Sequence, residues 1–402
     1  MTPSIDLFVF VDALGWELAQ RRRFLTDLLP HRQACDTLFG YSCTCDPSIL
    51  TGALPYQHGH FSFFTYDPKR SPFRWARPLG LIPEIFAGHH RLRNPLSRWV
   101  AKNLGYTGYF QLYSTPFKRL PQLDYTEKRD LYEPGGIIGG QPAIFEYWRA
   151  SGVPWIRSDW RAGDAANIDT MAGHLREGKV RLAYLINGGL DATMHAHTTT
   201  GPQTDASFAR LERWLRDLDT LARTRYAEVR WHIFSDHGMA DTHTCSRMMP
   251  EFEQLGLRYG RDYAATWDST MARFWFLGDA GIRTQVETWL AGRPEGRIVT
   301  ETELERWGCL FADRRYGELF YVLNEGVIFA PSFMNQRRVP AMHGYDPDLP
   351  NSRACWLTSH EVEQAPVRIE GIHHVMRAAA DRLAKAPRSL TTSPFPCPKR
   401  LR

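Results

Sequence analysis

Residues 40–59 read GYSCTCDPSILTGALPYQHG, and the rest of the chain is organised around this stretch. The apolar run 37–39 ends here, and small hydroxyl and thiol residues precede a segment, 46–51, that is predicted to be helical. Backbone N–H groups at the start of a helix bind anions, and the helix dipole adds partial positive charge there. Ser42 is therefore either an ordinary helix cap or a nucleophile whose developing oxyanion is stabilised.

Composition places the chain among globular proteins with a real core. Its 402 residues are 43% hydrophobic, which allows one large α/β domain or two or three domains. The sequence contains no run of about 18 apolar residues, so no membrane span is expected. The first apolar segment, 7–11, is short and lacks a basic region before it, and the seven cysteines have no regular spacing. A cytoplasmic protein is the expectation.

Apolar runs alternate with amphipathic segments over most of the chain. Residues 5–11 are predicted to be a strand buried on both faces, which is typical of a parallel sheet, and 180–186 another buried strand. A further strand is expected at 229–235. This pattern predicts an α/β fold with a mostly parallel central sheet and helices on both faces. Further strands are expected at 34–41, 153–156 and 271–277, and a hairpin at 318–323 and 327–330. Helices are expected at 17–29, 143–151, 165–177, 204–226, 283–290 and 369–383.

Residues 61–140 break this alternation and are predicted to form an inserted cap with a helix at 95–103. Prolines and glycines punctuate the segment, and residues 61–130 carry twelve Lys or Arg against five acids, with fourteen aromatic residues. The charge predicts either a solvated basic surface or a surface that meets an anionic substrate. The expected organisation is a core domain, 1–60 and 141–386, the cap, 61–140, and a flexible tail, 387–402.

Acids and histidines follow the predicted strands at the points where an α/β sheet places its ligands. Asp12, Asp191 and Asp236 end or closely follow apolar strands, and His237 follows Asp236 directly. His195 comes four residues after Asp191, on the same face of a helical turn, and His343 lies far downstream. Carboxylates, imidazoles and a deprotonated hydroxyl are ligands that zinc accepts.

As an ordered set, these motifs resemble the alkaline phosphatase superfamily, and within it the type I phosphodiesterase and nucleotide pyrophosphatase branch. The resemblance covers roughly 1–60 and 140–385. It rests on Val9-Phe-Val-Asp12, Thr51-Gly52, Pro55-x-x-His58-Gly59, Asp191-x-x-x-His195, Asp236-His237-Gly238-Met239 and Met342-His343-Gly344-Tyr345-Asp346-Pro347.

The resemblance implies two divalent metal ions, with zinc expected and manganese, magnesium or iron as alternatives. One ion would be held by Asp191, His195 and His343. The other would be held by Asp12, Asp236, His237 and the nucleophile, which the family places nine positions before the Thr of the Thr-Gly pair. Counting back from Thr51 gives Ser42.

The sequence departs from the family where an aromatic-Pro-Asn usually follows the nucleophile. Cys43-Thr44-Cys45 stands there instead, which leaves Thr44 and Cys43 as alternative nucleophiles. Cys43 is also similar to the nucleophile position of sulfatases, but their Cys-x-Pro-x-Arg pattern is missing. Thr44 and Arg273 are candidate substrate-binding residues, and a solvated sheet-edge position is the alternative for Arg273. His197 is an alternative ligand to His195, while His58 and His60 are expected to be structural.

The leading hypothesis is a metal-dependent hydrolase of a small anionic phosphodiester or pyrophosphate, acting through a phosphoseryl intermediate at Ser42. Phosphomonoesterase, phosphonate hydrolase and sulfatase are alternatives, because fold and metal site do not decide among them. A non-catalytic metal-containing binding protein is the alternative of another class. No nucleic-acid motif is present, the net charge is only +5, and nucleic acid is not expected as a partner.

Overall fold

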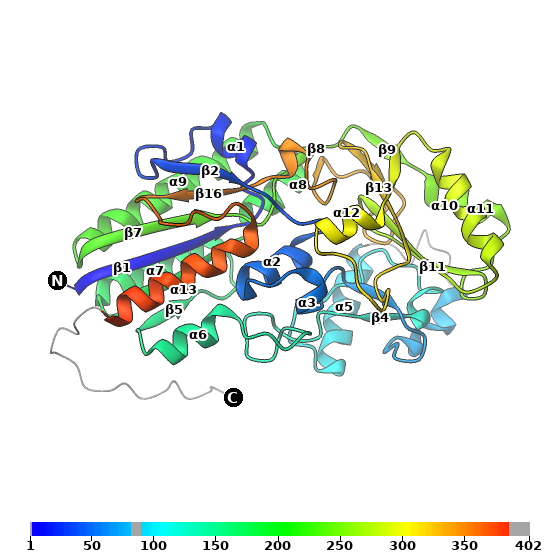
Figure 1. Cartoon of the computed structure of the whole chain (residues 1–402), viewed down its shortest axis with the longest axis horizontal. Helices are drawn as coiled ribbons and strands as arrows, with labels where there is room; N and C mark the ends of the chain where they lie inside the picture. The colour runs from blue at the N-terminus through cyan, green and yellow to red at the C-terminus, as the bar shows by residue number, and fades with distance from the viewer. Residues whose placement is uncertain (1, 82–89, 386–402) are drawn as a thin grey trace.

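A six-stranded sheet forms the centre of the larger part of the molecule (Figure 1). The computed structural model describes residues 2–81 and 90–385. The four strands on one side of this sheet are mutually parallel, and β16 runs antiparallel between β7 and β2. The spatial order is β2 (His31–Cys35), β16 (Ala354–Thr358), β7 (Tyr226–Phe234), β1 (Thr2–Val11), β6 (Leu182–Asn187) and β5 (Trp155–Arg157).

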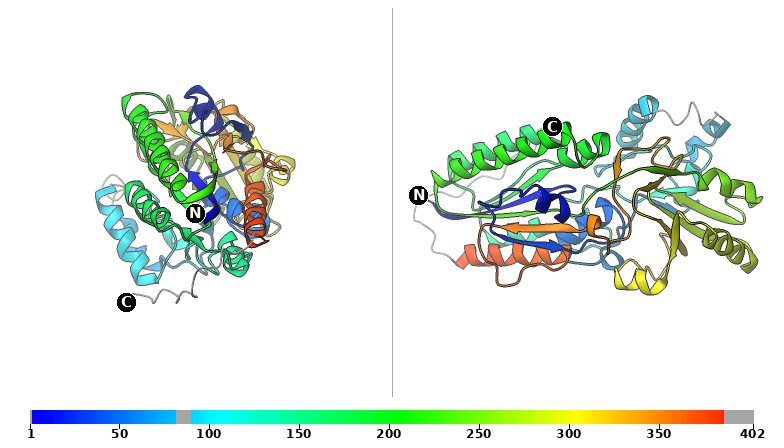
Figure 2. Two further views of the ribbon diagram at one scale, coloured as in Figure 1. Left: turned by 90° about the vertical axis from the view of Figure 1, so that its left-hand side faces the viewer. Right: turned by 90° about the horizontal axis from the view of Figure 1, so that it is seen from above.

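Strand β1 is buried on both faces because successive side chains point to opposite sides of the sheet. Leu7 and Val9 belong to one hydrophobic core, whereas Phe8 and Phe10 belong to another. Two layers of helices cover these faces (Figure 2). The first layer contains α1 (Trp16–Arg21), α7 (Asp164–Glu177), α8 (Gly189–His197) and α9 (Pro202–Arg223); the second contains α2 (Ser42–Thr51), α6 (Ile144–Ser151) and α13 (Ile372–Lys385). The predicted mostly parallel sheet with helices on both faces is thereby confirmed.

A second, antiparallel sheet lies beyond the carboxyl end of the first. Its order is β10 (Tyr263–Trp267), β11 (Met271–Phe276), β13 (Leu319–Leu323) and β12 (Gly296–Val299). The helices near it are α10 (Met248–Phe252), α11 (Ala280–Ala291) and α12 (Glu301–Arg306). Two short strand pairs accompany them: β8 (Ala240–Asp241) pairs with β15 (Ala341–Met342), and β9 (Thr244–Ser246) pairs with β14 (Val327–Phe329). This sheet was not foreseen from the sequence, which placed 271–277 in the same alternation as the central strands.

The segment 61–140 contributes side chains to the core of the second sheet. Phe63, Phe73, Leu120 and Tyr125 are buried in one cluster with Phe274. Within the segment, β3 (Phe64–Tyr66) pairs with β4 (Leu123–Tyr125), and α5 (His90–Leu104) contains the helix predicted at 95–103. The short helix α3 (Pro55–His58) precedes it. The predicted tail, 387–402, lies outside the described residues.

Three local predictions were wrong. The helix predicted at 17–29 ends at Arg21, and residues 22–28 form turns instead. Residues 318–323 and 327–330 do not form a hairpin, because β13 is already paired on both sides, with β11 and β12, and β14 pairs in parallel with β9. The strand predicted at 34–41 ends at Cys35, and the chain then crosses to α2 outside the sheet. Strand β2 nevertheless runs in the direction of β1, so it still carries the chain to the carboxyl edge of the sheet.

No helix within 2–81 and 90–385 is long and apolar enough to cross a membrane. The six cysteines of these ranges are all free thiols.

Candidate active site

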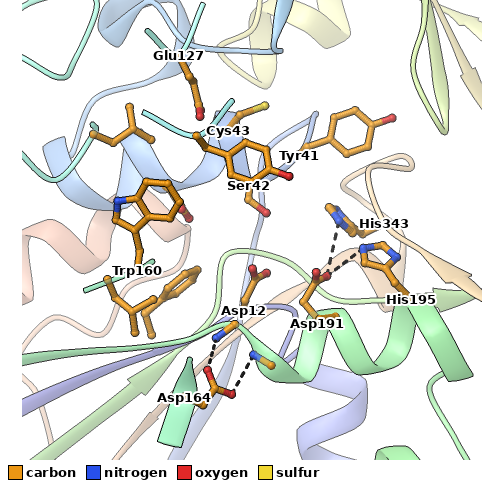
Figure 3. A pocket seen from close by; sticks show the side chains of 18 of the residues that line it. Asp12, Tyr41, Ser42, Cys43, Glu127, Trp160, Asp164, Asp191, His195 and His343 are labelled. Carbon is orange, nitrogen blue, oxygen red and sulfur yellow. Dashed lines mark hydrogen bonds and ion pairs between the residues drawn. The ribbon is translucent and has the colours of Figure 1, made fainter. Parts of the chain in front are cut away.

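A pocket of about 850 Å³ opens at the carboxyl edge of the central sheet (Figure 3). Asp12 follows the last residue of β1, Asp191 lies in the first turn of α8 just after β6, and Asp236 follows β7. The chain reaches this edge after each parallel strand, so residues far apart in sequence meet there. Ser42, at the start of α2, faces the same space.

Ser42 is the first residue of α2, four residues before the predicted start of that helix. Tyr41 precedes it with an extended backbone, and its hydroxyl is 2.9 Å from the Thr270 hydroxyl and accepts the Thr270 N–H. Because the first N–H groups of a helix have no partner within it, they remain available to an anion at this end. The Ser42 Oγ lies 3.0 Å from Nε2 of His237.

Asp191, His195 and His343 form the first cluster of candidate metal ligands. Nε2 of His195 lies 3.2 Å, and Nε2 of His343 3.8 Å, from Oδ1 of Asp191. Nδ1 of His195 donates to the Ala341 carbonyl at 2.8 Å, which leaves its Nε2 lone pair directed at the carboxylate. A hydrogen bond from the far ring nitrogen is the usual support of a metal-binding histidine.

Asp12, Asp236 and His237 form the second cluster, directly beside Ser42. Nε2 of His237 lies 3.0 Å from Oδ2 of Asp236 and 3.7 Å from Oδ1 of Asp12. Nδ1 of His237 donates to the Gly238 carbonyl at 2.9 Å, and the Ala13 N–H donates to the other oxygen of Asp236 at 3.3 Å. The ring of His237 stacks on that of His343, with centroids 3.7 Å apart, so the two clusters are adjacent.

The unpaired atoms of the two clusters fit divalent cations. Oδ1 of Asp12, Oδ1 of Asp191 and Oδ2 of Asp236 are buried without a hydrogen-bond donor. Burial, together with the neighbouring Asp236 and Asp191 carboxylates, raises the pKa of Asp12 well above its usual range. Carboxylates packed this closely need a positive charge among them, and each cluster offers the oxygen and imidazole ligands that zinc accepts.

Comparison with known proteins agrees with this geometry. The family model of the type I phosphodiesterases and nucleotide pyrophosphatases matches residues 38–346. The chain belongs to this family. Solved structures with low sequence identity to this chain have the same fold. Human ectonucleotide pyrophosphatase/phosphodiesterase 5 aligns at 13% identity with a TM-score of 0.64, covering 94% of this chain and 95% of that one.

Two further solved structures are similar to this member of the family. An inactive variant of the murine phosphodiesterase 5, in complex with AMP, aligns at 15% identity with a TM-score of 0.62, covering 94% of this chain and 95% of that one. Phosphonoacetate hydrolase from Sinorhizobium meliloti 1021, in complex with phosphonoformate, aligns at 14% identity with a TM-score of 0.63, covering 94% and 96%. The search of curated proteins finds no significant match.

The alternative nucleophiles are poorly placed in this family member. Thr44 is fully buried and its hydroxyl donates to the Phe61 carbonyl at 2.5 Å. Cys43 reaches the pocket wall, but burial raises the pKa of its thiol well above the usual value, which disfavours the thiolate. Ser42 is therefore the hydroxyl or thiol of this stretch that adjoins the metal-ligand clusters.

Arg273, predicted to contact substrate or solvent, does neither. It lies on β11, which is paired on both sides, and it is completely buried. Its guanidinium pairs with Asp268 at 3.1 Å and donates to the Phe64 and Tyr316 carbonyls. Arg273 therefore joins the segment 61–140 to the second sheet. Thr44 likewise lies outside the pocket lining.

The remaining histidines of the motifs are also explained. His197 is exposed at the end of α8, whereas His195 faces the cluster. His58 is buried, lies 2.8 Å from the Ser48 hydroxyl and accepts the His60 N–H. His60 in turn accepts the Ile138 N–H at 2.9 Å, so both residues brace the turn after α2, as their expected structural role implies.

The sequence did not single out the rest of the pocket. Asp46 and Glu127 line it, as do aromatic residues from three separate segments, among them Phe63, Tyr109 and Trp160. Asp46 follows Ser42 by four residues, and helical spacing alone would have placed the two on one face. Glu127 carried no such signal, because it stands in a segment dominated by basic residues.

Proposed function

We propose that the protein is a two-metal hydrolase of phosphodiester or pyrophosphate bonds, with Ser42 as its nucleophile. The observation that carries this proposal is the position of the Ser42 hydroxyl, 3.0 Å from His237 in one carboxylate–imidazole cluster and next to a second. The donor sets combine carboxylate and imidazole, so zinc is the metal proposed, with manganese or iron next and magnesium last. Membership of the phosphodiesterase family supports the same reaction class.

In the proposed reaction, the Ser42 hydroxyl gives its proton to solvent, and its Oγ forms a bond to phosphorus while the bond from phosphorus to the leaving oxygen breaks. The leaving oxygen keeps the electron pair and takes a proton from solvent. Water then attacks the phosphoserine, which releases a phosphate monoester and returns a proton to Ser42. Two bound divalent cations would lower the pKa of the Ser42 hydroxyl and balance the charge of the phosphoryl oxygens.

The size of the pocket favours a diester over a small monoester. About 850 Å³ is enough for a drug-sized ligand, far more than a phosphoryl group fills. Aromatic side chains line one part of the pocket. Phe63 and Tyr109 come from the segment 61–140, and Trp160 follows it in the sequence. They offer contact area to an organic group on the far side of the phosphorus.

A panel of aryl esters tests the proposal. The zinc-loaded protein is assayed on a bis-aryl phosphate, an aryl phosphate, an aryl phosphonate monoester and an aryl sulfate, and the diester is expected to give the highest kcat/KM. A clear preference for the aryl phosphate, the aryl phosphonate monoester or the aryl sulfate would overturn the proposed substrate class. Absence of turnover on the whole panel, with two metals bound, would favour a non-catalytic binding protein.

A further inference from the structure

The pocket is strongly acidic, and most of its carboxylates have identified partners. Asp12 and Asp191 belong to the candidate metal clusters. Asp164 accepts the N–H groups of Gly188 and Gly189 at 3.1 and 3.0 Å. Asp130 accepts from Arg161 at 2.9 Å and from the Trp160 indole at 3.1 Å. Two acids of the lining, Asp46 and Glu127, remain to be explained.

Glu127 is buried and Asp46 is half-buried, and neither carboxyl forms an ion pair within the described part of the chain. Glu127 is only 3% exposed, and its Oε1 has no hydrogen-bond donor. Oδ1 of Asp46 is equally unpaired, and Oδ2 has only the Tyr132 hydroxyl at 3.5 Å. Burial raises the pKa of both carboxyls, and the negative charge of neighbouring acids raises it further. Such groups are costly to bury unless something binds them.

The protein supplies almost no positive charge to this space. Among the described lining residues, Arg210 is the one Lys or Arg, and its guanidinium lies 5.4 Å from the centre of the Trp214 ring and contacts Ser207. None of the described lysines and arginines of 61–140 lines the pocket. The basic charge of that segment is therefore not directed at the substrate, although the sequence had allowed that interpretation.

Aromatic rings line the same pocket as the two unpaired carboxyls. The centroids of Phe63 and Tyr109 are 5.5 Å apart, and those of Tyr109 and Trp160 are 6.3 Å apart. Figure 3 shows Glu127 pointing into the pocket above Ser42, with Trp160 at the side and the metal-ligand residues opposite. Ring faces beside buried carboxylates form the environment that attracts a desolvated ammonium group.

We propose that Glu127 and Asp46, with the aromatic wall, form a subsite for a cationic group of the substrate. The substrate class is a phosphodiester in which a primary or quaternary ammonium is joined by a short chain to the phosphate. This inference rests on the proposed function for the ester chemistry. The cation would neutralise the two unpaired carboxylates, while the candidate metal-ligand clusters receive the phosphoryl group.

A pair of isosteric esters tests the subsite. 2-(Trimethylammonio)ethyl 4-nitrophenyl phosphate and 3,3-dimethylbutyl 4-nitrophenyl phosphate have the same shape and differ in one positive charge. Their consumption by the zinc-loaded protein is followed by 31P NMR, so that cleavage of either ester bond is counted. The ammonium ester is expected to have a kcat/KM at least about tenfold higher. Equal values, or a preference for the neutral ester, would overturn the subsite without affecting the proposed hydrolysis.

Variants assign the preference to the carboxyls. Glu127→Gln and Asp46→Asn keep the shape and remove the charge, so each is expected to reduce the ratio of the two kcat/KM values toward one. Glu133→Gln is the matched control, because Glu133 lies on the same segment, is exposed and pairs with Arg157 outside the pocket lining. A ratio unchanged in both pocket variants, with thermal unfolding showing them folded, would contradict the assignment.

A binding measurement separates the subsite from the reaction. Choline and 3,3-dimethylbutanol are titrated calorimetrically into the zinc-loaded wild type and Glu127→Gln. Choline is expected to bind at least about tenfold more tightly than the neutral alcohol, and only in the wild type. If neither ester is hydrolysed but choline binds in this way, the subsite stands and the proposed function fails. No difference between the two alcohols would overturn the subsite.

Discussion

Ser42 is the residue on which the proposed reaction depends. Replacing Ser42 by Ala removes the proposed attacking oxygen but leaves the six candidate carboxylate and imidazole ligands in place. Turnover of the aryl diester is expected to fall by about 10³-fold or more. Two metal equivalents are still expected by elemental analysis of the variant. Cys43→Ala is the matched comparison and is expected to keep most of the turnover, because burial raises the pKa of the thiol and disfavours its thiolate. Full activity of Ser42→Ala would exclude Ser42.

Asp12, Asp191 and Asp236 could be singled out from the sequence because each ends or closely follows an apolar strand, whereas the resemblance was needed to group them with His195, His237 and His343. Glu127 and Arg273 could not be placed in this way. Glu127 reaches the pocket through contacts among segments distant in sequence, and the segment in which it stands, 61–130, is basic as a whole. Arg273 looked accessible, but Asp268 and three backbone or hydroxyl oxygens bury its charge. Long-range pairing decides both cases.

Strand β1 and helix α13 are joined by a buried ion pair. Asp6, 1% exposed, contacts His232 at 2.9 Å and the guanidinium of Arg382. His360 packs edge-on against His232, and Arg230 adds a further positive charge nearby. Burial alone would raise the pKa of Asp6, but His232 and Arg382 outweigh it and lower the value. Asp6, His232 and His360 lie close enough together to hold a metal ion. Because Arg382 already neutralises the Asp6 carboxylate, these three residues have no need of a metal.

This pair predicts a pH-dependent contribution to stability. A depressed pKa in the folded state stabilises the fold above the unfolded value of about 3.9. Asp6→Asn is therefore expected to lower the free energy of unfolding by about 1–3 kcal/mol at pH 7. The difference from wild type should shrink as the pH falls below about 4 and through the folded pKa. Urea unfolding at several pH values measures it, and a difference independent of pH would be inconsistent with the pair.

Two loops of the active site approach each other so closely that only glycine fits. A Cβ on Gly238, next to His237, would overlap the backbone carbonyl oxygen of Asn351, which cannot rotate away. Gly238→Ala is expected to destabilise the protein by about 2 kcal/mol or more and to reduce metal affinity. Gly173→Ala is the control, since a Cβ there meets nothing within 4 Å and helix α7 should gain about 0.5–1 kcal/mol. Thermal unfolding compares the stability of Gly238→Ala with that of Gly173→Ala. Equal stability of the two variants would contradict the close approach of the two loops at Gly238.

The central sheet could be predicted from hydrophobic periodicity, but the second sheet could not. Strands β1 and β6 are mainly apolar runs, and the amphipathic helices between β1, β6 and β7 indicate parallel pairing. Strands β13 and β14 flank a turn sequence, yet β13 pairs with β11 and β12. In an antiparallel sheet the partners depend on contacts across the whole lobe, which local turn chemistry does not specify.

Bound metal should stabilise the whole molecule, because the ligands come from both ends of the chain. Asp12 and His343 are brought together only by folding, and cations that bind the folded state alone increase its stability. Chelation is expected to lower the Tm of the zinc-loaded protein by about 5–10 °C. Asp191→Asn should reduce this shift. An identical Tm with and without chelator, in protein shown to have lost its metal, would contradict the coupling.

Anomalous diffraction from crystals of the zinc-loaded protein, collected on both sides of the zinc absorption edge, tests the central claim most directly. The expected result is two zinc peaks, one among Asp191, His195 and His343 and one among Asp12, Asp236 and His237 beside the Ser42 hydroxyl. Empty clusters at saturating zinc, or ions bound only elsewhere on the molecule, would contradict the account.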